Sequence, residues 1–289
     1  MGLKIVNNQI VGKIDNLKSK LNGEIPITRE ELFVLINSWG RKLNFDTTGS
    51  NNDRFYINRC VPNQCYNLSK LDVSEITNMS NMFSYSNFDG DINSWDVSKV
   101  TDMHAMFYQS KNFNQPIENW DTSNVTDMTY MFCYARAFNQ PLNFDTSKVK
   151  DMDYMFYNKI EFNQNISNWN VSNVTSMSYM FYDVESFNQN ISSWNFDNII
   201  SCDYMFYNAK AFKDRYNSGK PLPEDTDDIK TWININRDRM NAIDIKENHG
   251  EEIDDFFSNI NLTFYQNATS NLLTECNKSS NRMQQAICL

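Results

Sequence analysis

The chain has 289 residues, of which 40% are hydrophobic, and its 26 basic and 36 acidic side chains give a formal net charge of −10. This length accommodates one elongated domain or two compact ones, each with a sizeable core. The acidic excess lies in residues 71–212, with 7 basic and 17 acidic side chains, and because such a surface repels phosphate backbones we expect no nucleic-acid partner.

Residues 1–70 are predicted to form a helical N-terminal cap and a lead-in loop. Within "ITREELFVLINSWG", Thr28 and Glu31 stand in capping-box register and Gly40 is a stop signal, so this stretch predicts a helix. The first twenty residues contain no apolar run of signal-peptide length, and no segment reaches the roughly 18 apolar residues of a membrane span. We therefore expect no membrane insertion, and a cytoplasmic or virion location rather than secretion.

Four of the six cysteines lie outside the repeats, in the pairs Cys60/Cys65 and Cys276/Cys288. Either pair could form a disulfide in an oxidising compartment. A zinc site on the first pair would need two further ligands, and the chain has only two histidines. The other two cysteines stand in repeat columns and are predicted to be buried, reduced thiols. We expect no metal and no cofactor.

Residues 71–212 repeat with a period of 24 or 25 residues over about six units. A Met-Phe pair marks each unit: Met82/Phe83, Met106/Phe107, Met131/Phe132, Met155/Phe156, Met180/Phe181 and Met205/Phe206. One unit cannot bury its own apolar edge, but stacked units can, with equivalent side chains lying over one another.

Two patterns within a unit suggest its secondary structure. Val100, Met103 and Met106 recur at a spacing of three residues, which predicts a short helical turn. The following "FNQPIENW" alternates and reads as a short strand. Together they predict an α/β solenoid: a leucine-rich-repeat-like right-handed coil with a short parallel sheet, short helical turns, a helical N-terminal cap and a helical C-terminal region.

Polar residues also form columns. Asp or Asn two residues before Ser or Asp suits Asx turns, and a second aspartate column, Asp102, Asp127 and Asp151, would suit the first turn of a helix. The alternative role for the stacked aspartates is calcium chelation. Amide and tyrosine columns are the candidate partner-binding residues: Tyr130, Tyr154, Tyr179, Tyr204, Asn139, Gln140, Asn163, Gln164, Asn188 and Gln189. The amides can hydrogen-bond along the stack, and a tyrosine ridge suits protein recognition.

Residues 213–289 are predicted to be a helical cap or partner-docking region. "DTDDIKTWININRDRM" places Ile229, Trp232, Ile233 and Met240 on one helical face, and "EEIDDFFSNINLTFY" repeats the pattern. We expect this region to dock on the last repeat.

The phrase "FNQNISNWNVSNVTSMSYMFYDVESFNQNISSWN" resembles the BspA-like surface-protein family, whose 25-residue leucine-rich-type repeats match roughly residues 66–212. "TREELFVLI" is similar to the segment that precedes the first such repeat. The resemblance implies a surface, adhesion or interaction role and provides no catalytic residue.

The residues themselves point away from an enzyme, because the chain contains no nucleophile elbow, P-loop, HExxH motif or glycine-rich dinucleotide turn. We expect a non-enzymatic structural or protein–protein interaction component, of a virus particle or an intracellular assembly, with a protein partner. The alternative is a surface adhesin that binds a host protein or glycan.

Overall fold

A computed structural model of the chain describes the backbone of residues 4–6, 9–11, 17–37, 41–45, 55–59, 68–159 and 161–249. The chain divides into two compact units, Met1–Arg237 and Asp238–Leu289. The paired cysteines of the disulfide and zinc hypotheses, and the helix predicted within residues 251–265, lie outside the described residues.

The elements in chain order are β1 (Lys4–Val6), β2 (Gln9–Val11), α1 (Leu17–Leu21), α2 (Arg29–Asn37), β3 (Arg41–Phe45), β4 (Phe55–Arg59), α3 (Lys210–Asn217) and α4 (Thr226–His249). β1 pairs with β2 and β3 pairs with β4, both antiparallel, with Leu43 opposite Ile57 in the second pair. None of the helices in the described part of the chain combines the length and the apolar character that crossing a bilayer requires.

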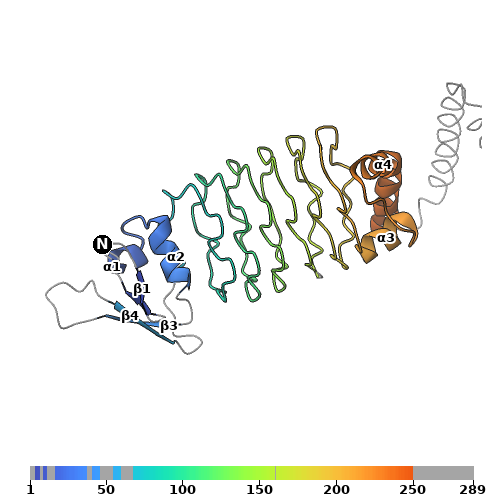
Figure 1. The fold of residues 1–289 in the computed structure, drawn as a ribbon. Helices are drawn as coiled ribbons and strands as arrows, with labels where there is room; N and C mark the ends of the chain where they lie inside the picture. Colours follow the sequence, from blue (N-terminus) through green and yellow to red (C-terminus); the bar gives the residue numbers. More distant parts are fainter. Residues whose placement is uncertain are drawn as a thin grey trace, which may run out of the picture. The chain divides into compact units, whose positions relative to one another are not determined.

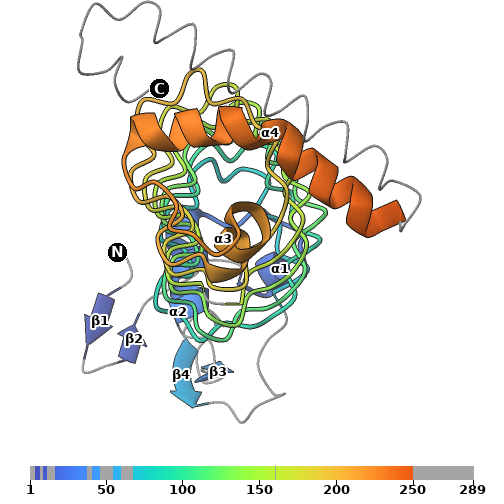
Figure 2. The same cartoon turned by 90° about the vertical axis from the view of Figure 1, so that its right-hand side faces the viewer.

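The predicted α/β solenoid with a parallel sheet is wrong. Among the described residues of the repeats, from 68 to 208, there is neither a strand nor a helix. The backbone instead forms successive coils of turns that lie side by side (Figure 1) and overlie one another when the view is turned by 90° (Figure 2). Neighbouring coils share only isolated parallel bridges, such as Asp102 with Asp127.

The hydrogen bonds explain why no strand forms. Between the first two coils, four N–H groups donate to the next coil at 2.8–2.9 Å: Met79, Asn81, Phe83 and Tyr85 donate to the carbonyls of Asp102, His104, Met106 and Tyr108. The intervening N–H groups, for example that of Met82, donate three residues back within the same turn. Since these donors are used locally, consecutive β-turns replace the extended backbone that a strand needs.

The turns contain residues with left-handed backbone angles. In each coil two positions have φ between 51° and 59°: Asn81/Tyr85, Ala105/Gln109, Tyr130/Tyr134, Tyr154/Asn158, Tyr179/Asp183 and Tyr204/Asn208. Tyrosine rarely adopts this conformation, which costs about 1–2 kcal/mol for a non-glycine residue. The hydrogen bonds between coils hold it in place.

Equivalent apolar side chains form the core. The phenylalanines of the Met-Phe pairs stack from coil to coil with ring centroids 4.9–5.9 Å apart and planes within 10° of parallel. Trp120 is 3% exposed, and its indole N–H donates to the carbonyl of Ile92 in the preceding coil at 3.0 Å. Each coil therefore buries the apolar edge of its neighbour, as the repeated columns indicated.

The two predictions about aspartate columns have different outcomes. The Asx turns are confirmed: the backbone N–H of Ser98 donates to the Asp96 carboxylate at 3.0 Å, and that of Ser147 donates to Asp145 at 2.9 Å. The helix-terminus role of Asp102 is wrong, because no helix forms there and its carboxylate accepts the N–H of His104 in a further Asx turn.

Helix α3 and the first part of α4 close the last coil. Arg215 of α3 donates to the carbonyl of Asn188 at 2.6 Å, and Lys230 of α4 donates to that of Ile199 at 2.8 Å. The N–H of Tyr204 has no following coil and donates instead to the carbonyl of Glu224. These contacts satisfy backbone groups that a further coil would otherwise satisfy.

Candidate functional site

The candidate site is the strip of turns on the coil stack, which we call the turn face. It comprises six equivalent segments: residues 78–85, 102–109, 127–134, 151–158, 176–183 and 201–208. In each segment the second, fifth and sixth residues are buried, as are Met79, Met82 and Phe83 in the first. The other positions carry the face's polar and aromatic side chains, except for Ala105 and Cys133, which are buried.

The predicted tyrosine column is an unbroken stack of rings. The ring centroids of Tyr130 and Tyr154 lie 4.6 Å apart, those of Tyr154 and Tyr179 lie 4.7 Å apart, and those of Tyr179 and Tyr204 lie 5.3 Å apart. The planes are within 21° of parallel. Because each ring covers the face of the next, the column presents ring edges and phenol groups rather than ring faces.

A second tyrosine column runs beside the first. Tyr157, Tyr182 and Tyr207 stack at 4.9 and 4.6 Å, and Tyr157 is 5.5 Å from Tyr154 of the first column. Desolvation and the neighbouring Tyr134 raise the pKa of Tyr157 to about 12. Its phenol therefore stays protonated at neutral pH and can both donate and accept hydrogen bonds.

Carboxylates line the tyrosine columns. Asp127 and Asp151 are bridge partners in successive coils, and Asp153 stands two residues further along. Desolvation raises the pKa of Asp153, and the negative charges of Asp151 and Asp127 raise it further, against the lowering effect of hydrogen bonds from Ser176 and Ser178. Like charges thus share this edge of the turn face.

The amide column links the coils, as predicted. The Nε2 of Gln164 donates to the carbonyl and the Oδ1 of Asn139, both at 3.0 Å, and Gln189 donates in the same way to Asn163 at 3.0 and 2.7 Å. At the end of the column, Arg215 takes the place of the next glutamine. These amides have a structural role, and their partner-binding role stays a prediction.

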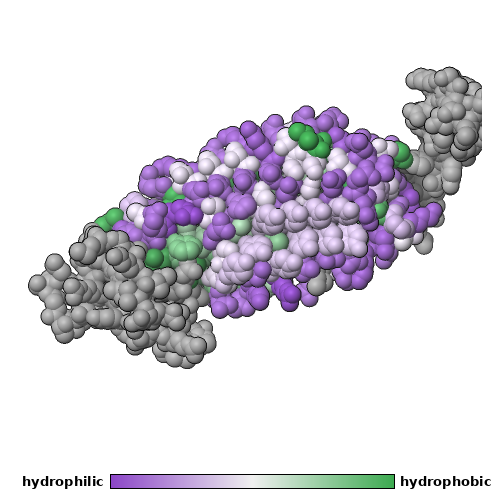
Figure 3. All heavy atoms as spheres, in the orientation of Figure 1, coloured by the Kyte–Doolittle hydropathy of each residue, from purple (hydrophilic) through white to green (hydrophobic). Residues whose placement is uncertain are grey.

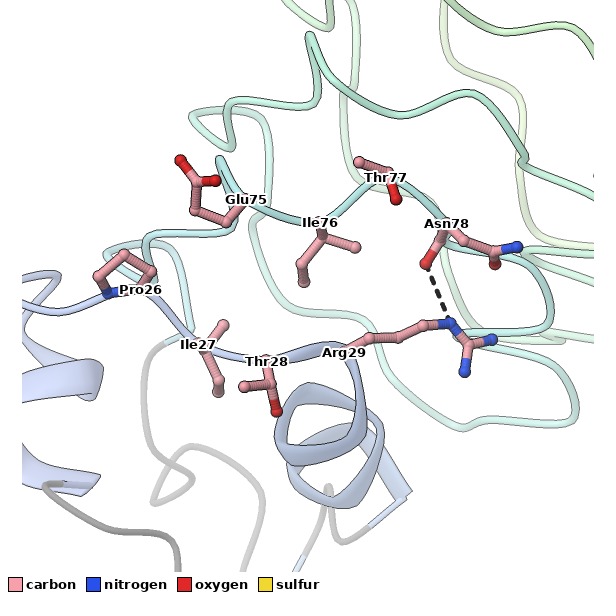
Figure 4. A pocket seen from close by; sticks show the side chains of 8 residues that line it. All are labelled: Pro26, Ile27, Thr28, Arg29, Glu75, Ile76, Thr77 and Asn78. Atoms are coloured by element: carbon pink, nitrogen blue, oxygen red, sulfur yellow. Dashed lines mark hydrogen bonds between the residues drawn. The ribbon is translucent and has the colours of Figure 1, made fainter.

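A cleft of about 280 Å³ lies between the start of α2 and the first coil (Figure 4). It is lined by Pro26, Ile27, Thr28, Arg29, Glu75, Ile76, Thr77 and Asn78. The predicted capping box is confirmed here, with the Thr28 N–H donating to Glu31 and the Glu31 N–H donating to Thr28. Arg29 reaches across the cleft and donates to the carbonyls of Asn78 at 3.0 Å and Ser80 at 2.6 Å.

The contacts of Arg29 give a stability prediction. Arg29→Ala should lower the free energy of unfolding by about 1 kcal/mol, because two carbonyls of the first coil lose a charged donor. Arg29→Lys, which keeps the charge but not the two-pronged geometry, should recover only part of this loss. Urea denaturation measures both variants. An unchanged free energy of unfolding for Arg29→Ala would contradict the proposed contribution of the Arg29 hydrogen bonds to stability.

The described residues show no constellation for metal chemistry. Within them, no three His, Cys, Asp or Glu side chains gather in a way that could hold a metal ion. Burial raises the pKa of the Cys133 thiol to about 12 and that of Cys202 to about 11, which disfavours the nucleophilic thiolate. His104 packs edge-on against Tyr130 at 5.9 Å.

The coils and their exposed columns define the chain as a repeat protein. The model of the family described as "Mycoplasma protein of unknown function, DUF285" matches residues 54–143 and 142–234, and the chain belongs to this family. No curated protein and no solved structure matches the chain.

Proposed function

We propose that the protein is a non-enzymatic interaction component that binds a protein partner through its turn face. The repeat motifs resemble those of BspA-like surface proteins, and this resemblance supports an interaction role; the family that the chain belongs to is itself of unknown function. The same binding role applies to a partner inside a cell, in a virus particle or on a surface.

The observation that carries the proposal is the double column of tyrosines. Tyrosine offers a large amphipathic contact area at a low entropic cost, and it is enriched where proteins bind one another. Stacking between coils already fixes the rings. Binding a partner would therefore cost little conformational entropy of these side chains. On the face drawn in Figure 3, weakly hydrophilic side chains form a band across the coils between strongly hydrophilic margins.

The glycan-binding form of the adhesin alternative has weaker support. Sugar recognition by aromatic side chains uses an open ring face, and the faces of Tyr154 and Tyr179 are covered by the neighbouring rings at 4.6–5.3 Å. Protein recognition can use the ring edges and phenols that stay accessible.

The test compares two variants of the full-length chain in affinity isolation from the source cell, quantified by mass spectrometry. Tyr154→Asn with Tyr179→Asn removes two rings, and asparagine suits the left-handed backbone because Asn81 occupies the same column. The control is Lys148→Asn, in a column that already holds Asn124 and Asn173.

A true partner should be recovered about tenfold less with the tyrosine variant and unchanged with the control. A second pair, Gln140→Ala with Gln164→Ala, asks whether the amide column contributes. Partners retained equally by every folded variant would contradict a recognition role for the turn face.

A further inference from the structure

The turn face is segregated by charge. Its six segments contain ten of the chain's 14 tyrosines and none of its 26 lysines and arginines. Six aspartates lie in the same segments: Asp102, Asp127, Asp151, Asp153, Asp183 and Asp203. The basic residues of the repeats lie outside these segments, among them Lys99, which pairs with Glu75 at 2.7 Å, and Lys150, which directly precedes the fourth segment.

The tyrosines of the turn face are partly desolvated and lie near these carboxylates. Desolvation raises the pKa values of Tyr130, Tyr154 and Tyr182, and neighbouring carboxylates, Asp153 for the first two and Asp183 for the third, raise them further. A phenol oxygen beside carboxylates is a hydrogen-bond acceptor in a negative potential. Such a surface favours a ligand with many cationic N–H donors.

The turn face is less suited to two other ligand chemistries. A phosphate-bearing ligand would find no lysine or arginine within the six segments, and Arg29, which reaches the first of them, already donates to the carbonyls of Asn78 and Ser80. A flat base or sugar would find the tyrosine ring faces covered. A basic polypeptide can instead place arginine or lysine side chains against the phenol edges and the carboxylates at once.

We propose that the turn face binds an extended, basic segment of a partner protein, an inference that rests on the proposed interaction function. Arginine and lysine of the segment donate hydrogen bonds to Asp127, Asp151 and Asp153 and to the adjacent tyrosine phenols. Five steps of about 4.8 Å between coils span about 24 Å, which an extended chain covers with seven or eight residues.

The probe is a fluorescein-labelled peptide of about 10 residues that alternates arginine with serine, a length set by that span. Its control replaces arginine with citrulline, which keeps the shape and removes the charge. Fluorescence anisotropy with the full-length protein measures Kd at about 50 and about 300 mM salt. We expect the arginine peptide alone to bind, and its binding to weaken with salt.

Two matched variants locate the binding. Asp127→Asn with Asp151→Asn removes two charges from the turn face, in a column that begins with Asn78. Asp121→Asn with Asp145→Asn removes two charges from the Asx-turn column, which already holds Asn170 and Asn195. The first variant should raise Kd about fivefold and the second less than about twofold.

Equal losses in the two variants would show a nonlocal effect of net charge and would overturn the proposal. Equal binding of the arginine and citrulline peptides would also overturn it. If the arginine peptide fails to bind while Tyr154→Asn with Tyr179→Asn still loses a cellular partner, the basic-segment proposal falls and the interaction function stands.

Discussion

Trp120→Ala should lower the free energy of unfolding by about 3–5 kcal/mol, measured by urea denaturation. The side chain is 3% exposed, and its ring lies 6.2 Å from that of Phe107. Removal leaves a cavity between coils and takes the indole donor from the carbonyl of Ile92. Both effects act on the same interface, so this is the largest single-residue loss that we expect in the repeats.

Two controls separate the core from the turn face. Trp120→Phe should cost roughly half as much, because Phe144 occupies the same column in the next coil and remains 3% exposed. Tyr154→Asn should cost about 1 kcal/mol, since its ring is only half-buried and asparagine suits its backbone angles. Equal, small losses for Trp120→Ala and Tyr154→Asn would contradict the assignment of Trp120 to the core and of Tyr154 to the turn face.

Lys159 should contribute a stabilisation that increases with pH. Its side chain is fully buried and its Nζ donates to the carbonyl of Arg136 at 2.9 Å. Burial lowers its pKa from 10.5 to about 8. Because the unfolded chain keeps the proton up to higher pH than the folded chain, the contribution of Lys159 to stability is least below pH 8 and increases toward pH 10.5. Between pH 7.5 and 9.5 this contribution should rise by about 2 kcal/mol. The buried thiols of Cys133 and Cys202, whose pKa values are raised, act in the opposite direction above about pH 9, so the Lys159 contribution is measured as a difference between two proteins.

Lys159→Met provides the matched measurement. The equivalent positions in other coils hold small, uncharged residues such as Ser110, Ala135 and Val184, all buried. Denaturant unfolding of both proteins from pH 7.5 to 9.5 should show the free energy of unfolding of the wild type rising by about 2 kcal/mol relative to that of the variant, because Cys133 and Cys202 affect both proteins equally. A constant difference between the two proteins over this range would contradict the role of Lys159.

The repeat period predicted the core but not the backbone. The interval between Met-Phe pairs correctly predicted that the phenylalanine rings lie over one another, because equivalent residues are buried in every repeat irrespective of its secondary structure. The spacing of Val100, Met103 and Met106 predicted a helical turn, but consecutive β-turns bury residues at the same spacing. Sequence periodicity alone does not separate the two.

Asparagine in some coils indicated the left-handed turn positions, but tyrosine occupies the same positions in other coils and does not predict positive φ. Asn81 shares a column with Tyr130, and Asn158 shares one with Tyr134, and asparagine is the common non-glycine residue with positive φ. Tyrosine ordinarily prefers negative φ, and the hydrogen bonds between coils outweigh this preference.

The candidate site was only partly predictable. The tyrosine and amide columns are visible in the sequence, and the structure brings each together as a continuous row. The row of Asp127 and Asp151 was assigned to helix ends, so its place beside the tyrosines was missed. A count of charged residues column by column would have found the absence of lysine and arginine from the turn face.

The register of the coils underlies both the core and the turn face, and an engineered disulfide tests it most directly. The hydroxyl oxygens of Ser178 and Ser201, in successive coils, lie 2.6 Å apart. Ser178→Cys with Ser201→Cys should therefore oxidise almost completely in the native protein, whereas Ser123→Cys with Ser201→Cys should not. Peptide mass spectrometry identifies the crosslinks. Equal crosslinking of the two pairs, or none in the first, would contradict the stacking of equivalent coils.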